Sequence, residues 1–104
     1  MCYIFQVKEN HHPVCPITRV ASLLSDTWTI LIMHTVSDGP KRFCELEKAL
    51  DGISTRTLTL KLQKLVAEEL LERTATNYYQ ATQKGSGLKI IEKAMMKYSK
   101  EYLE

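Results

Sequence analysis

The spacing of apolar residues predicts two helices near the start of the chain. Apolar side chains recur every three or four positions after Pro16, and this periodicity indicates a helix over about 16–25. Proline is well placed at the first position of a helix, where its missing N–H costs no hydrogen bond. A second helix is expected after Ser25 and Asp26, which can cap it, and Gly39-Pro40 should end it. Its apolar stripe consists of Trp28, Leu31, Ile32 and Val36.

Two further helices are predicted between Phe43 and Glu69, with a tight turn between them. The first is short, and its apolar residues are Leu46 and Leu50, four positions apart. Asp51-Gly52 forms the turn, and Ser54 is a suitable N-cap for a longer helix that reaches about Glu69. The longer helix has one apolar side, made of Leu58, Leu62, Leu65 and Val66. Together these elements predict a helix-turn-helix.

The last third of the chain changes its period twice. Leu70–Thr74 and Tyr78–Thr82 are β-compatible runs, and the tight loop between them predicts a hairpin. From Gln83 the helical spacing returns and continues to the end, with an apolar seam of Leu88, Ile91, Met95, Tyr98 and Tyr102. The predicted fold is mainly α with a small β-hairpin: a winged helix-turn-helix with an appended C-terminal helix.

Composition fits one small domain. A chain of 104 residues with 44% apolar and 25% charged residues can bury a single core. Residues 1–15 are interpreted as an N-terminal arm, either a short strand or a loosely docked segment. Residues 16–104 are expected to form the winged helix-turn-helix domain, whose last helix spans about 84–104. No apolar run is long enough for a membrane span, and no export signal is recognisable, so a cytoplasmic protein with reduced cysteines is expected.

The charge of the chain is unevenly distributed. The net charge is only +2, but residues 53–104 hold nine basic and six acidic side chains, against five and six in residues 1–52. No acid occurs from Ile53 to Ala67, so the predicted longer helix has a polar side with only positive charge. A helix of this kind fits the major groove of double-stranded DNA. The predicted DNA-binding residues are Ser54, Thr55, Arg56, Thr57, Leu60, Lys61 and Lys64, with Lys41 and Arg42 as phosphate contacts.

A second hypothesis stays open from the residues alone. The low net charge and the short hairpin also suit a winged-helix protein-interaction module that docks a partner without binding DNA. Catalysis finds little support, because the chain has no glycine-rich phosphate loop or nucleophile elbow and its carboxylates are scattered. No cofactor is predicted. His11, His12, Cys15 and Cys2 are metal-type residues, but they lack a C-x-x-C pair, and no metal site is predicted.

Several motifs together resemble the HxlR-type winged helix-turn-helix transcriptional regulators. They are Cys15-Pro16, Trp28-Thr29-x-Leu31, Gly39-Pro40-x-Arg42-Phe43-x-Glu45-Leu46, Gly52-Ile53-Ser54-x-Arg56-Thr57-Leu58, Leu71-Glu72-Arg73 and Tyr79-x-x-Thr82-x-Lys84-Gly85. The resemblance implies a homodimeric DNA-binding regulator in which residues 54–64 enter the major groove. It also implies that the last helix is a C-terminal dimerisation helix, so that its apolar seam forms the dimer interface, with Leu88, Ile91, Met95, Tyr98 and Tyr102. Two features depart from the family pattern. Glu69 replaces a common glycine, so the stop of the longer helix should be made differently, and the wing is several residues shorter.

Cys15 matches a cysteine that some members of this family use to sense electrophiles or oxidants. A partly exposed thiol near a helix start would be favoured as the reactive thiolate by the helix dipole. The alternative is a buried, inert packing cysteine. Under the first interpretation Cys15 is a redox thiol and an oxidant or small molecule is the effector. Cys2 would be a second thiol, whereas Cys44 borders the predicted short helix.

Overall fold

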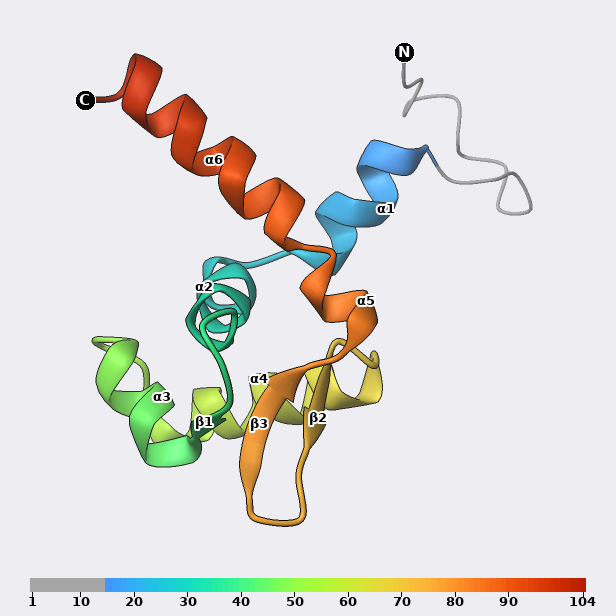
Figure 1. Cartoon of the computed structure of the whole chain (residues 1–104), viewed down its shortest axis with the longest axis vertical. Helices are drawn as coiled ribbons and strands as arrows, with labels where there is room; N and C mark the ends of the chain where they lie inside the picture. Colours follow the sequence, from blue (N-terminus) through green and yellow to red (C-terminus); the bar gives the residue numbers. More distant parts are fainter. Residues whose placement is uncertain (1–14) are drawn as a thin grey trace.

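The computed structural model describes residues 15–104 (Figure 1), which contain six helices and three short strands. The expected mainly α fold with a small sheet is confirmed. In chain order the elements are α1 (Pro16–Leu23), α2 (Thr27–Val36), β1 (Lys41–Arg42), α3 (Phe43–Ala49), α4 (Thr55–Ala67), β2 (Leu71–Arg73), β3 (Tyr78–Ala81), α5 (Gln83–Ser86) and α6 (Lys89–Tyr102). Figure 1 shows α1 and α6 extending from one end of the body, while the β2–β3 hairpin projects from the other.

The hairpin is part of a three-stranded antiparallel sheet with the order β1-β3-β2. Arg73 of β2 lies opposite Tyr79 of β3, and Arg42 of β1 lies opposite Tyr78. The sequence predicted the two hairpin strands but not β1, because two residues are too few to show a period. The third strand ties the start of α3 to the wing.

The core lies where α2, α3, α4 and the sheet meet. The leucines at 58, 62 and 65 bury the inner side of α4, and each is at most 1% exposed. Trp28 and Phe43 are partly buried and pack against the same cluster. Two members of the predicted apolar stripes lie at the edge of the core, because Leu31 and Val66 are 39% and 37% exposed.

The C-terminus of α4 is closed by a Schellman motif. The N–H of Leu70 donates to the carbonyl of Leu65, and the N–H of Glu69 donates to that of Val66, both at 3.0 Å. Glu69 itself adopts the left-handed conformation, with φ of 63°. The expectation of a different stop is therefore wrong: the chain makes the usual stop with a residue that has a Cβ.

The single C-terminal helix that the sequence predicted is two helices, α5 and α6. The chain passes very close to β2 at Gly85, where an added Cβ would lie 2.1 Å from the Leu70 carbonyl oxygen. Thr82 caps α5 by accepting a hydrogen bond from the Gly85 N–H, at 3.1 Å. The segment is therefore anchored to the core before α6 begins and leaves the body.

Candidate nucleic-acid interface

Ser54 and Thr55 hold the start of α4 in place. The Ser54 hydroxyl oxygen accepts a hydrogen bond from the Thr57 N–H at 3.0 Å, as an N-cap does. The Thr55 hydroxyl donates to Oε2 of Glu47 on α3 at 2.6 Å. Both residues are exposed. Ser54 therefore caps α4 locally, and the contact of Thr55 with Glu47 joins α4 to α3, the two helices of the helix-turn-helix.

The outward side of α4 is polar, cationic and open to solvent. Arg56, Gln63 and Lys64 are exposed, and Leu60 is 52% exposed between them. Thr57 lies at the margin and is partly exposed. No acidic side chain belongs to α4, whose sequence is TRTLTLKLQKLVA. The buried leucines on the other side leave this surface accessible, so the helix can approach the bases of a duplex.

Lys61 is not part of that surface, although the sequence placed it among the DNA-binding residues. Its Nζ lies 2.6 Å from Oδ2 of Asp26, the N-cap of α2, and its side chain is only 25% exposed. Burial alone would raise the pKa of Asp26, but hydrogen bonds from Lys61 and from the Thr29 N–H outweigh it and lower that pKa below its ordinary value of 3.8. Lys61 therefore fixes α4 against α2.

The two predicted phosphate contacts before α3 differ from each other. Lys41 is partly buried, and its Nζ donates to the Gly39 carbonyl at 3.4 Å. Arg42 is exposed, and its guanidinium lies 4.5 Å from the centre of the Tyr78 ring. Hydrogen bonding to Tyr78 raises the pKa of Arg42 above its ordinary value, so this cation stays protonated. Arg42 is thus the more available of the two.

The predicted DNA-binding residues include none from the β2–β3 wing, but the structure places a cation of the wing beside α4. The guanidinium of Arg73 lies 5.8 Å from the centre of the Tyr79 ring. A groove of about 300 Å³ separates this pair from α4. The arrangement depends on which residues of β2 and β3 lie opposite each other, and this register could not be assigned from the sequence.

Much of the predicted dimer seam is uncovered along α6. Met95, Tyr98 and Tyr102 are 51%, 59% and 69% exposed, and the two tyrosine rings lie 5.0 Å apart. Leu88 is different, because it is 6% exposed and belongs to the chain's own core. Ile91 is partly buried and packs against that core. On α1, Ile17 is 66% exposed, an apolar surface to which the sequence analysis gave no role.

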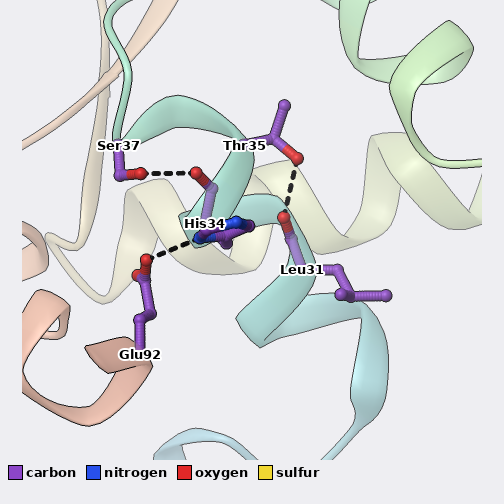
Figure 2. A network of polar contacts seen from close by, with 5 residues as sticks. All are labelled: Leu31, His34, Thr35, Ser37 and Glu92. Atoms are coloured by element: carbon purple, nitrogen blue, oxygen red, sulfur yellow. Dashed lines mark hydrogen bonds and ion pairs between the residues drawn. The ribbon is translucent and has the colours of Figure 1, made fainter. Parts of the chain in front are cut away.

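A polar contact that the sequence did not reveal connects α2 to α6. Figure 2 shows Nδ1 of His34 on α2 facing Oε1 of Glu92 on α6, at 2.9 Å. The Glu92 side chain is only 8% exposed, and Glu92 is the buried residue of α6. The Ser37 hydroxyl donates to the His34 carbonyl at 2.6 Å, which tethers the end of α2. Residues 34 and 92 are too far apart in the chain for any local pattern to pair them.

Cys15 is the N-cap of α1 and is 7% exposed. Cys44 is a free, exposed cysteine on α3. Cys2, His11 and His12 lie outside the described residues. In the described part of the chain, no three metal-type side chains are grouped closely enough to hold an ion. No helix over residues 15–104 is long and apolar enough to span a bilayer.

A short helix, a tight turn, an exposed cationic helix and a β-hairpin beside it define a winged helix-turn-helix protein. The match to a family model makes the class specific: residues 23–104 fit the HxlR-like helix-turn-helix family, and the chain belongs to that family. The relatives described below are named HTH-type transcriptional regulators, and the expected family resemblance is confirmed.

Two relatives illustrate the match. The HTH-type transcriptional regulator YodB of Bacillus subtilis is 33% identical over 98 residues, which cover 88% of each chain. The regulator sll1512 of Synechocystis is 33% identical over 97 residues, covering 88% of this chain and 72% of its own. The solved structure of quinone-bound YodB superposes with a TM-score of 0.78 and 34% identity, over 85% of this chain and all of that one. YodB has also been solved after diamide treatment.

Proposed function

We propose that this protein is a homodimeric, sequence-specific transcriptional regulator that acts in the cytoplasm, where its DNA target lies. The observation that carries the proposal is the outward side of α4. Arg56, Leu60 and Lys64 are exposed there without any acid on the helix, and the inner leucines hold them in a fixed orientation. Arginine can donate two hydrogen bonds to guanine, and leucine can contact the methyl group of thymine.

The proposed dimer rests on the exposed apolar side chains of α6. Met95, Tyr98 and Tyr102 are each more than half exposed, and an apolar strip of this kind marks an association surface. Leu88 is excluded from the interface because it is buried in its own chain. A twofold pair presents two α4 helices, so the DNA site should be a pseudo-palindrome with half-sites about 10 bp apart, or a multiple of that spacing.

Selection of bound duplexes from a random or genomic pool tests DNA binding, symmetry and spacing together. We expect enrichment of an inverted repeat with the spacing given above, and retention on DNA that weakens steeply as salt rises. Recovery of only unselected sequence at low salt, with no repeat, contradicts sequence-specific reading. No retention at any salt contradicts DNA binding altogether.

We also propose that an oxidant or a small electrophile controls DNA binding through Cys15. The support is its position at the start of α1, and the similarity to YodB, which has been solved with bound quinone and after diamide treatment. DNA affinity should differ between protein kept in a thiol reductant and protein treated with diamide. Cys15→Ser should remove this difference, and Cys44→Ser should keep it. The opposite pattern assigns the response to the exposed Cys44.

A further inference from the structure

A groove of about 230 Å³ lies between α2 and α6. Its walls are mainly apolar: Ile30 and Leu31 come from α2, and Met95 and Met96 come from α6. Leu31 and both methionines are each more than a third exposed, so the chain itself leaves these walls uncovered. Methionine side chains are flexible and polarisable, and they adapt to ligands of different shape. A cavity of about 150 Å³ accepts benzene, so this groove has room for a two-ring aromatic group.

One acidic side chain lies in this apolar groove. Glu92 and His34 are its only ionisable lining residues, and the Glu92 side chain is only 8% exposed. Oε1 of Glu92 faces Nδ1 of His34 at 2.9 Å (Figure 2), whereas within residues 15–104 no hydrogen bond is made to Oε2. A carboxylate can accept several hydrogen bonds. His34 therefore positions the carboxylate and leaves part of its accepting capacity unused.

The position of Glu92 is unfavourable for packing alone. Moving an ionised carboxylate out of water is costly, and a single partner compensates only in part. Met95, Met96 and Ser99 follow Glu92 at helical spacing and line the same groove, so this side of α6 faces α2. No lysine or arginine lines the groove. The charge that would complement this site is therefore positive and is not supplied by a lysine or arginine of the chain.

We propose that this groove binds an organic cation, in which an ammonium or amidinium group is joined to an apolar body of about one or two rings. The N–H groups of the cation donate to Oε2 of Glu92, and the apolar body packs against Leu31 and the two methionines. No cysteine lines the groove, so this ligand is distinct from the electrophile proposed for Cys15. The groove shares no residue with the outward side of α4, so the site is independent of the proposed function.

The first test compares three naphthalene probes of similar size and different charge: naphthylmethylamine, naphthylmethanol and naphthoate. The full-length chain carries ¹³C in its methionine methyl groups, and each probe is titrated at neutral pH by NMR. The methyl signals of Met95 and Met96 should shift, while that of Met33, which is 2% exposed in the core, should stay in place. The amine should bind about tenfold more tightly than the alcohol, and naphthoate should bind least. Equal affinity for all three probes contradicts a cation site.

The second test removes the charge of the groove. Glu92→Gln should lower the affinity for naphthylmethylamine to that for naphthylmethanol, and should leave the affinity for the alcohol unchanged. Glu101→Gln is the matched control, because it removes an exposed acid of α6 that does not line the groove. If Glu92→Gln binds the amine as the parent does, at equal thermal stability, Glu92 is not the counter-ion and the proposal is wrong.

A third test keeps Glu92 and occupies the site from within the chain. Met96→Lys places an ammonium group four positions after Glu92, within reach of its carboxylate, and should weaken amine binding at least about tenfold. Met96→Leu keeps an apolar wall and should bind nearly as the parent does. Parent-like amine binding by Met96→Lys contradicts the site.

The alternative occupant of the groove is a second copy of the chain, because Met95 also belongs to the exposed apolar strip of α6. Titrations at two protein concentrations, with the mass measured by sedimentation at each, distinguish the two. The amine should bind the dimer with one molecule per chain. If the amine binds only after dilution has dissociated the dimer, the partner chain covers the groove and the proposal is wrong.

Discussion

The helices α4 and α6 are almost equal in length, with 13 and 14 residues, but they complete their packing in different ways. α4 buries three leucines against its own chain and exposes a polar, cationic side. α6 buries one charged residue, Glu92, and exposes most of its large apolar side chains. The apolar side of α4 is thus buried within its own domain, whereas most of the apolar side of α6 is exposed. The difference indicates that α4 presents a surface suited to a polar ligand, whereas α6 presents one suited to an apolar partner.

The largest effect is expected from disrupting the surface of α6. The double substitution Tyr98→Lys with Tyr102→Lys should convert a dimer into a monomer of 12.0 kDa in sedimentation equilibrium. Affinity for a two-half-site operator should fall by at least about 100-fold, because the second half-site is no longer held near the first. Both side chains are exposed, so the isolated fold should survive.

Lys93→Glu is the matched control for that disruption. Lys93 is exposed and lies half a turn round α6 from Tyr102, so its substitution should leave the dimer intact. An unchanged mass for the double variant would show that α6 does not form the interface.

The next largest effects are expected on the outward side of α4. Arg56→Ala should cost about 1–3 kcal/mol of binding free energy on the operator and relax the preference for one base. Lys64→Ala should weaken binding to all DNA sequences similarly. It should also reduce the slope of the log of the binding constant against the log of the salt concentration by about one. Fluorescence anisotropy with the selected site and with scrambled duplexes distinguishes the two results. Parent-like binding by both variants at low and moderate salt contradicts the role of α4.

Lys61 should behave differently from Lys64, although only three positions separate them. Lys61→Met should leave DNA affinity unchanged and reduce the free energy of unfolding by about 0.5–1 kcal/mol, since it breaks the contact with Asp26. Because folding lowers the pKa of Asp26, this carboxylate stabilises the fold above its ordinary value of 3.8, and that stability is lost as pH falls through the lowered value.

Urea unfolding at several pH values checks this assignment of Lys61. The difference between parent and Lys61→Met should be constant near neutral pH and should shrink as the solution becomes more acidic than about pH 4. If Lys61→Met instead lowers DNA affinity without lowering stability, Lys61 belongs to the DNA-binding surface.

The smallest effect is a gain in stability at the end of α4. Glu69→Gly should raise the free energy of unfolding by about 0.5–1 kcal/mol, because glycine adopts a positive φ without the steric cost of a Cβ. Thermal unfolding measures the gain, and Glu68→Gly is the control. Glu68 has a φ of −85°, so glycine should destabilise there.

Features set by neighbouring residues could be predicted from the sequence. The cap at Ser54, the leucine stripe of α4 and the two hairpin strands depend on local spacing, and each is present in the structure. The partners of Lys61, Arg73 and Glu92 could not be predicted, because each depends on how separate elements pack. The left-handed conformation of Glu69 was not predicted, because glycine is the residue that usually adopts it at the end of a helix. Local chemistry therefore predicted the elements, and tertiary packing decided which cations remain exposed.

The attachment of α6 has a mechanical consequence. The helix is fixed near its first turns, by Leu88 and by the contact between Glu92 and His34, and beyond them it extends for most of its length. The ten helical residues beyond Glu92 measure about 15 Å, so a pivot of about 10° at this root would carry the free tip through nearly 3 Å. In a twofold pair joined by these levers, such a swing would alter the distance between the two α4 helices and the pitch at which they meet the duplex.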